Sequence, residues 1–252
     1  FADPPEGMRV IVLHAAGEHF CAGLDLIEML SQPKRNAIEG QRRSRAWHRV
    51  FDLMQFGEVP VVSVLKGAVV GGGLEMAAAT HVRVAEPSTF FQLPEGQRGI
   101  FVGGSGSVRI PRIIGAGRVV EMMLTGRRYD ARQGLDLGLV HYLADEGQGL
   151  AQARELARQI ASNAPTSNYA VINGIARVAE MGYAEGLMAE SFIAAATGAD
   201  AAKRINSFFD GRRQAGGDAP AEPTAPAAVD TAGDAAAPAA ADASADPPAG
   251  GA

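Results

Sequence analysis

The stretch Lys66-Gly-Ala-Val-Val-Gly-Gly-Gly-Leu-Glu75 decides how this chain folds. An apolar, β-branched run enters three consecutive glycines and leaves them as a sequence that favours helix, which predicts a strand, a tight turn and a helix start. The N–H groups of a helix's first turn have no partners within the helix, and the helix dipole adds positive potential there. Glu75 is therefore expected to hold a carboxylate next to backbone N–H groups that Gly71 and Gly72 leave open to a ligand.

A second glycine turn lies upstream, in His19-Phe-Cys-Ala-Gly-Leu-Asp25. Its centre, Ala22-Gly23-Leu24, predicts a tight turn, and Asp25 suits the cap of the helix that follows. If this turn converges with the glycines after Lys66, the N–H groups of Leu24 and Gly72 meet at one oxygen. Two such donors form an oxyanion hole, in which each donor is worth about 3–4 kcal/mol to the transition state.

A second glutamate follows twenty positions after Glu75. It is Glu95, in Phe90-Phe-Gln-Leu-Pro-Glu95-Gly-Gln-Arg-Gly-Ile-Phe-Val-Gly-Gly-Ser-Gly106, and this segment predicts a loop that leads to another helix start. Carboxylates held next to bare N–H groups suit general acid and base catalysis on a carbonyl compound whose oxygen becomes negative.

Hydrophobic patterns along the chain predict an α/β fold with parallel strands. Apolar runs predict strands at 8–14, 59–65 and 82–85 and a short strand or turn at 139–143. The helix predicted at 40–55 carries an apolar stripe that suits either core or pocket lining: Trp47, Val50, Phe51 and Met54. Further helices are predicted at 74–80, 108–114, 118–124, 131–137, 150–163, 167–181, 186–196 and 199–209.

We expect three parts: an α/β core over residues 1–164, a helical region over 165–213 and a tail over 214–252. From Ala215 to Ala252 the sequence holds 17 alanines, 6 prolines and 6 acidic residues, with no Lys, Arg or aromatic side chain. Such a segment buries too little apolar surface to offset an ordering cost of about 1–2 kcal/mol per residue, so we expect disorder. The first residues, Phe1-Ala-Asp-Pro-Pro, resemble the end of a helix that enters a loop, so the native chain is expected to begin upstream.

Composition argues against several function classes. The net charge of −5 depends on the tail, because the rest of the chain holds 22 acidic and 23 basic side chains, a balance that predicts no nucleic-acid partner. A single cysteine, Cys21, allows no intrachain disulfide and fits a reducing compartment. With no membrane-length apolar run and no leader pattern in these residues, we expect a cytoplasmic location. The five histidines show no metal-ligand spacing, and the phosphate-loop pattern GxxxxGK[ST] is missing.

Four motifs, taken in order, resemble those of the crotonase, or enoyl-CoA hydratase/isomerase, superfamily. They are Phe20-Cys-Ala-Gly-Leu-Asp-Leu26, Gly71-Gly-Gly-Leu-Glu75, Leu93-Pro-Glu95 and Gly103-Gly104. Each motif alone is weak, but their order and spacing are specific, and the resemblance covers about residues 8–210. It implies a crotonase-like fold of repeated ββα units with a helical C-terminal trimerisation region, and hence a homotrimer or a dimer of trimers.

The resemblance also implies an activity. Family members bind an acyl-CoA thioester, with CoA as part of the substrate and no separate cofactor. They hold the thioester oxygen between two backbone N–H groups, which correspond here to Leu24 and Gly72. Gly103, expected to open a helix, matches a glycine whose N–H helps to polarise the thioester. The expected substrate contacts are completed by Ala22, Gly23, Asp25 and Gly71.

In the hydratases of this superfamily two glutamates flank a water molecule, and Glu75 and Glu95 match them. Glu75 is then expected to deprotonate water for attack at C3 of a 2-enoyl-CoA, and Glu95 to deliver a proton to C2. Because two carboxylates near one water repel each other, one of them is expected to hold a proton at neutral pH, and the sequence leaves open which one.

Two departures and two alternatives accompany this interpretation. Val102 stands at a position where many family members have proline. The family's first strand and helix would precede Met8, and in family members the loop between them contributes to CoA binding. The basic cluster at Arg42, Arg43 and Arg45 suits either a solvated helix face or a contact with CoA phosphates. An enoyl-CoA isomerase that uses Glu95 alone, and a non-catalytic acyl-CoA-binding scaffold whose tail recruits partners, both remain open.

Overall fold

A parallel sheet with the strand order β1-β2-β4-β7 lies at the centre of the computed structural model, which describes residues 1, 3–31 and 36–214. Its strands are β1 (Ile11–Leu13), β2 (Val61–Leu65), β4 (Val82–Ala85) and β7 (Tyr142–Leu143). The parallel pairing predicted from the sequence is confirmed. The strand predicted at 8–14 is shorter than expected, because only Ile11, Val12 and Leu13 are in register with partners on β2.

A second, smaller sheet has the order β3-β5-β6 and was not predicted. It consists of β3 (Ala68–Val70), which pairs in parallel with β5 (Phe90–Gln92), and β6 (Tyr129–Asp130), which pairs antiparallel to β5. Each strand has only two or three residues, too few to show a period of two in the sequence. The succession of β2, β3 and helix α3 (Gly72–Ala78) makes one ββα unit of the kind expected.

Where a range was predicted, the remaining helices lie close to it, with ends shifted by up to five residues, and the 3-10 turn at Gly96–Arg98 was not predicted. They are α1 (Leu26–Ser31), α2 (Ala37–Gln55), the 3-10 turn η1 (Gly96–Arg98), α4 (Gly106–Ile114), α5 (Ala116–Thr125), α6 (Ala131–Leu137), α7 (Gly149–Ser162), α8 (Pro165–Val178), α9 (Tyr183–Ala196) and α10 (Gly198–Gln214). β4, β5 and α4 form a second ββα unit, with η1 inserted before the helix.

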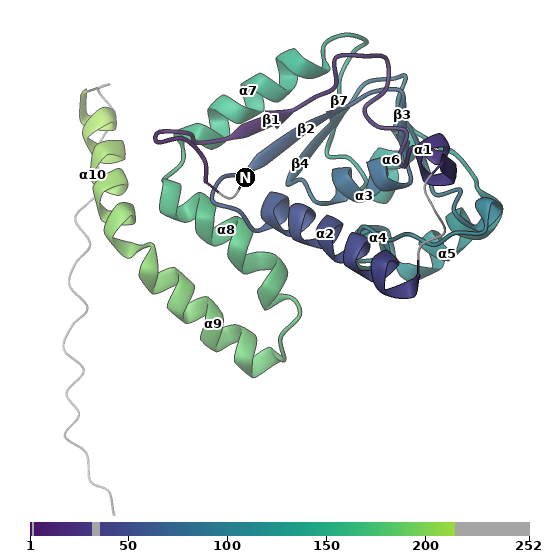
Figure 1. Ribbon diagram of the computed structural model, residues 1–252. Coiled ribbons are helices and arrows are strands. Elements are labelled where there is room, and N and C mark those ends of the chain that lie inside the picture. Colours follow the sequence, from purple (N-terminus) through teal and green to yellow (C-terminus); the bar gives the residue numbers. More distant parts are fainter. Residues whose placement is uncertain (2, 32–35, 215–252) are drawn as a thin grey trace, which may run out of the picture. The chain divides into compact units, whose positions relative to one another are not determined.

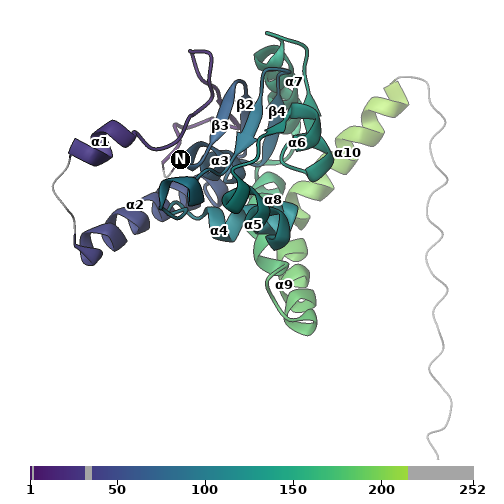
Figure 2. The same ribbon diagram turned by 90° about the vertical axis from the view of Figure 1, so that its right-hand side faces the viewer.

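Helices cover both faces of the central sheet, as parallel strands require (Figure 1 and Figure 2). On one face, Val62, Val64 and Val84 pack with Ala153 of α7. On the other face, α2 and α3 pack near β1, where Phe51 and Met54 are buried with Leu13. Since side chains alternate along a strand, Ser63 of β2 points to the face covered by α2 and α3. Its hydroxyl forms a hydrogen bond of 2.8 Å with the hydroxyl of Thr80, just after α3.

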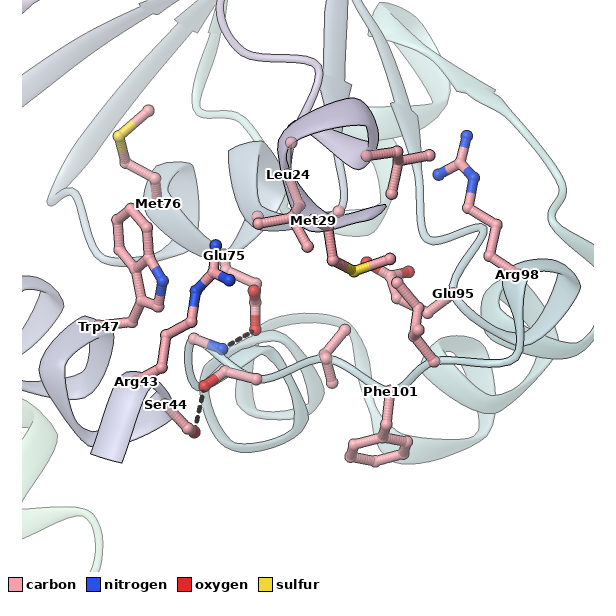
Figure 3. Close-up of a pocket in the computed structure, with 18 of the residues that line it drawn as sticks. Leu24, Met29, Arg43, Ser44, Trp47, Glu75, Met76, Glu95, Arg98 and Phe101 are labelled. Atoms are coloured by element: carbon pink, nitrogen blue, oxygen red, sulfur yellow. Dashed lines mark hydrogen bonds between the residues drawn. The ribbon is translucent and has the colours of Figure 1, made fainter. Parts of the chain in front are cut away.

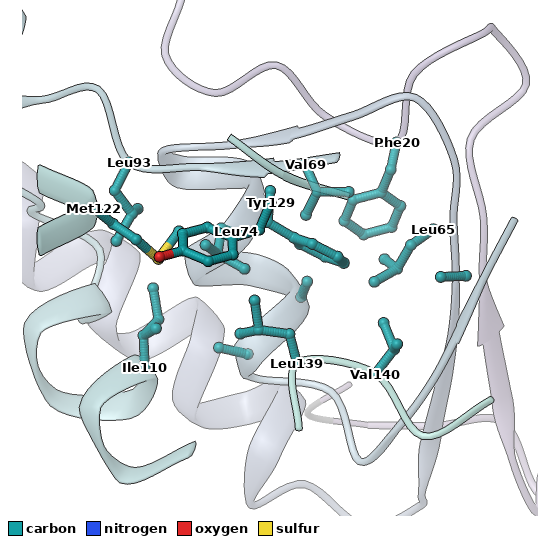
Figure 4. Packing of buried hydrophobic residues seen from close by; sticks show 14 of the residues in the cluster. Phe20, Leu65, Val69, Leu74, Leu93, Ile110, Met122, Tyr129, Leu139 and Val140 are labelled. Carbon is teal, nitrogen blue, oxygen red and sulfur yellow. The ribbon is translucent and has the colours of Figure 1, made fainter. Parts of the chain in front are cut away.

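The largest buried cluster lies between the smaller sheet and α3, α4, α5 and α6 (Figure 4). Leu74 points into it from α3, Ile110 from α4 and Met122 from α5, and each side chain is almost fully buried. Burial of a side chain of this size contributes about 1.5–3 kcal/mol. This cluster therefore fixes the first turns of α3 and α4, which carry the residues of the site.

Residues Phe1–Ser207 form one compact unit, and Phe208–Ala252 belong to a second. Only the last residues of α10 are described in the second unit, and the predicted tail lies outside the described residues from 215 onward. None of the helices in the described ranges is long and apolar enough to cross a membrane.

Candidate active site

A cavity of about 470 Å³ opens where the glycine turns meet (Figure 3). Eight of the site residues expected from the sequence line it: Ala22, Gly23, Leu24, Gly71, Gly72, Glu75, Glu95 and Gly103. Asp25, the ninth, does not line the cavity. Its carboxylate accepts hydrogen bonds from the N–H groups of Ile27 and Glu28 and so caps α1, as its position after the turn predicted.

The two turns that carry Leu24 and Gly72 are joined by backbone hydrogen bonds. The Cys21 N–H donates to the Ala68 carbonyl at 3.0 Å, and the Val70 N–H donates to the Cys21 carbonyl at 3.1 Å. A Cβ added at Gly23 would lie 2.7 Å from the Val70 oxygen and 3.4 Å from the Gly72 nitrogen, so only glycine fits between the two turns. The convergence proposed from the sequence is thus present.

Two backbone donors remain free at this junction. Neither the Leu24 N–H nor the Gly72 N–H donates to an acceptor within the described part of the chain, and both residues line the same cavity. Gly71, with φ +55°, turns the chain from β3 into α3 and leaves Gly72 at the first helical position, where no intrahelical acceptor exists. This arrangement suits an oxygen atom that gains negative charge.

Glu75 is held by the loop before α4. Its carboxylate, on a residue only 5% exposed, accepts at Oε1 from the Gly104 N–H at 2.9 Å and from the Gly106 N–H at 2.6 Å. Burial raises the pKa of Glu75, while these two N–H groups and the positive charge of Arg109 act in the opposite direction. The carboxylate therefore has a fixed orientation toward the cavity.

The expectation that Gly103 opens a helix is wrong. Helix α4 begins at Gly106, and Ser105 before it adopts φ +93°. The chain is bent there because the N–H groups on both sides of Ser105 turn toward Glu75. Gly103 instead accepts at its carbonyl a hydrogen bond of 2.5 Å from the Ser44 hydroxyl of α2 (Figure 3).

Glu95 occupies a different wall of the cavity (Figure 3). It stands just before η1 without a capping bond from its side chain and is 6% exposed, and its Oε2 is the only buried side-chain oxygen or nitrogen in the described ranges without a hydrogen-bond partner. Burial raises the pKa of Glu95, and the nearby charge of Glu75 raises it further. The backbone N–H of Glu95 itself and the charge of Arg98 act in the opposite direction and lower this pKa. A Cβ added at Gly71 would lie 2.7 Å from Glu95 Oε1, so the glycine turn also makes room for this carboxyl group.

Large apolar side chains complete the cavity, and two arginines join them. The apolar contributors are Leu26, Met29, Trp47, Phe51, Met76, Ile100, Phe101 and Val102. Trp47 contacts Phe51 with ring centroids 5.7 Å apart, and both line the cavity; of the stripe predicted on α2, Met54 is core and Val50 is exposed. Of the basic cluster at 42–45, only Arg43 lines the cavity, and Arg98 lies at an edge, directed away from the glutamates (Figure 3).

Several site residues were not found from the sequence: Ser44, Gly104, Ser105, Gly106 and Arg109. They hold the loop before α4 mainly through contacts with distant parts of the chain, and of the five only Gly104 stands in a motif, Gly103-Gly104, which assigned it no role. Within the described residues, no group of three or more His, Cys, Asp or Glu side chains is placed to hold a metal ion.

Comparison with known proteins gives the class to which this fold and site belong. The family model described as enoyl-CoA hydratase/isomerase matches residues 3–215. The chain therefore belongs to the enoyl-CoA hydratase/isomerase family. The crystal structure of a proposed enoyl-CoA hydratase from Rhodopseudomonas palustris is 47% identical, with a TM-score of 0.79 over 84% of this chain and 81% of that one.

Sequence relatives agree with this assignment. A Bacillus subtilis protein provisionally named as an enoyl-CoA hydratase is 30% identical over 212 residues, which are 82% of this chain and 81% of the relative. The fatty acid oxidation complex subunit alpha of Shewanella loihica is 39% identical over 154 residues, which are 60% of this chain. The chain spans only 22% of the length of that second relative.

Proposed function

We propose that this chain is a hydro-lyase that adds water across the C2=C3 double bond of a 2-enoyl-CoA thioester. The observation that carries the proposal is the presence of two buried glutamates, Glu75 and Glu95, on one cavity with two free N–H donors. General acid and general base groups beside an oxyanion hole are what this reaction needs. Family membership and the hydratase names of its relatives support the same activity.

The thioester oxygen is proposed to lie between the N–H groups of Leu24 and Gly72. Negative charge that develops on this oxygen is stabilised there, and the double bond loses electron density at C3. The turn residues Ala22, Gly23 and Gly71 shape the wall around the thioester, and Gly103 adds backbone polarity beside it. The apolar lining from α1, α2 and 100–102 suits the acyl chain.

The two glutamates are proposed to carry out different proton transfers. Glu75 acts as the carboxylate base that removes a proton from water: burial raises its pKa, but two N–H donors and the Arg109 guanidinium act in the opposite direction and favour its charged form. Glu95 acts as the acid that protonates C2, because burial and the charge of Glu75 both favour its neutral form. The proton shared by the pair thus resides on Glu95.

An enoyl-CoA isomerase is the second candidate, and one observation favours it. The Oε2 atom of Glu95 has no partner, so this carboxyl group is free to take a proton from one carbon and return it to another. The family description includes isomerases. Retention of a second, firmly held glutamate at position 75 favours hydration, because an isomerase has no water to activate.

Turnover of two substrates separates the candidates. Purified protein is assayed with crotonyl-CoA, a 2-enoyl-CoA, and with a 3-enoyl-CoA of matched length. We expect hydration to exceed double-bond migration by at least about tenfold. Faster migration would establish the isomerase, and CoA-thioester binding without any turnover would establish the non-catalytic scaffold. Activity that persists after treatment with chelators would agree with a reaction that needs no cofactor.

We also propose a homotrimer or a dimer of trimers in the cytoplasm. Helices α8 and α9 leave large apolar side chains exposed, more than an isolated surface normally carries: Tyr169, Val171, Ile175, Tyr183, Leu187, Met188 and Phe192. Association would bury these side chains. A monomer at micromolar concentration in light scattering would contradict the oligomer, and fractionation of the native cells tests the location.

The division of the chain at 164 and 213 is likewise a proposal. The composition of residues 215–252 gives them no part in the site, so a chain that ends at Gln214 should keep its turnover and its oligomeric state. Loss of either property on truncation would assign the tail a structural or partner-binding role.

A further inference from the structure

Arg109 is buried at the base of the loop that holds Glu75, and the proposed mechanism uses it only as a nearby positive charge. It lies on α4, one helical turn after Ser105, and is 8% exposed. Its guanidinium group donates to three side chains: Nε to Gln55 Oε1 at 2.6 Å, Nη2 to Asp52 Oδ1 at 2.5 Å, and Nη1 to the Ser105 hydroxyl. A buried arginine with this many directed bonds has little freedom to move.

These bonds join the loop 103–106 to helix α2. Gln55 and Asp52 lie in the last turn of α2, and Ser44, two to three turns earlier on the same helix, donates to the Gly103 carbonyl. The chain is therefore attached to α2 before Gly104, through the Gly103 carbonyl, and again after Gly106, through Arg109. These two attachments flank the N–H groups that bind Glu75. The helix that lines the acyl side of the cavity also sets the position of the loop.

Ser105 is the residue through which Arg109 reaches Glu75. It is the only non-glycine residue with positive φ among the residues described, at +93°. This conformation turns the flanking N–H groups of Gly104 and Gly106 onto the same Glu75 oxygen. A left-handed serine is unfavourable by itself and persists only when surrounding contacts hold it, and the bond from Arg109 is such a contact.

We propose that Arg109 is a positioning residue for the reaction: through Ser105 and α2 it holds the loop 103–106 that fixes the Glu75 carboxylate. This inference rests on the hydratase function proposed above. Arg109 itself does not line the cavity and touches no reacting atom. Its loss should therefore affect the rate of the chemical step more than substrate binding.

Arg109→Met is the main test, and Arg112→Met is its matched control. Arg112 lies three residues further along α4, but it is exposed and pairs with Glu180 outside the cavity. Because a misplacement of about 1 Å can lower a rate by about 10²-fold, we expect Arg109→Met to lower kcat on crotonyl-CoA about 10²-fold, with KM within about twofold. Arg109→Lys, which keeps the charge but not the planar fork, should recover part of the loss, and Arg112→Met should behave like the unmodified protein.

Hydrogen exchange gives a readout that does not need activity. The Gly104 and Gly106 amides should exchange faster in Arg109→Met than in Arg112→Met, whether or not crotonyl-CoA is the substrate. A kcat of Arg109→Met within about twofold of the unmodified protein, or a lower kcat without faster exchange of these two amides, would overturn the proposal. Inactive unmodified protein with faster exchange in the variant would instead reject the hydratase function and keep the positioning role.

A second variant covers a failure of Arg109→Met to fold. Asp52 is 60% exposed, so Asp52→Asn should fold, yet it removes the charged partner that orients the guanidinium group. We expect it to lower kcat by about threefold to tenfold and to leave KM unchanged. An unchanged kcat together with unchanged exchange at Gly104 and Gly106 would contradict the proposal.

Discussion

The two glutamates of the site are buried to the same degree but are held in opposite ways. Glu75 lies on a helix and accepts two backbone N–H groups at one oxygen, from a loop that is itself attached to α2. Glu95 lies at the start of a single 3-10 turn and has one buried oxygen with no partner. Burial alone would raise the pKa of both, so the difference between them comes from their neighbours.

This contrast supports the proposed division of the acid and base roles within one cavity. N–H donors and the positive charge of Arg109 favour the ionised form of Glu75, and that charge in turn favours the neutral form of Glu95. A fixed carboxylate can orient a water molecule, whereas a carboxyl group with a free oxygen can move its proton to carbon.

The largest effect is expected from removal of either carboxyl group. Glu75→Gln and Glu95→Gln should each lower kcat for hydration about 10²–10⁴-fold, which is the usual contribution of a general acid or base. Steady-state assays on crotonyl-CoA measure this loss, with circular dichroism as a check of folding. A variant that keeps near-normal hydration would remove its residue from the mechanism.

The next effect comes from the glycine that approaches Glu75 most closely. A Cβ at Gly106 would lie 2.8 Å from Glu75 Oε1, so Gly106→Ala should displace the carboxylate and lower kcat about 10²-fold. Gly117→Ala on α5 is the control, since a Cβ there meets nothing within 4 Å. Equal activity of the two variants would show that the orientation of Glu75 is unimportant.

The pH profile should follow from the two raised pKa values. Protonation of Glu75 as the pH falls removes the base, and ionisation of Glu95 as the pH rises removes the acid, so kcat/KM should be bell-shaped with about a tenfold decline per pH unit on each side. Because burial raises both pKa values, the acid limb should lie above the ordinary range of a glutamate. Loss of the alkaline limb in Glu75→Gln and not in Glu95→Gln would reverse the assignment.

The smallest effect should come from loss of the contact between Ser44 of α2 and the loop 103–106. Ser44→Ala removes the hydrogen bond to the Gly103 carbonyl and a longer one, of 3.2 Å, to His48 Nε2, and it leaves the bonds of Glu75 in place. A net contribution of about 1 kcal/mol for such a bond corresponds to a loss in kcat of about fivefold. A loss as large as that of Gly106→Ala would mean that the position of Glu75 depends mainly on this end of α2.

The parts of the site that the sequence predicted are those with local patterns. We could assign the glycines at 71–73, Glu75 that follows them, and Glu95 in its loop, because turn geometry depends on residues that are neighbours in the sequence. The contacts of Arg109 could not be assigned, because they join residues 54 and 57 positions apart and depend on how α2 packs against α4. The smaller sheet escaped prediction for a related reason: its strands are too short to show a period, and they exist only through their pairing.

The division of protons between Glu75 and Glu95 is the central claim, and it can be measured directly. Protein labelled with ¹³C at the glutamate carboxyl carbons is titrated by NMR, with Glu75→Gln and Glu95→Gln spectra to assign the two resonances. We predict that Glu95 titrates at a higher pH than Glu75, and that the pKa of Glu95 falls when the charge at position 75 is removed. A Glu75 resonance that titrates at the higher pH would contradict this account of the site.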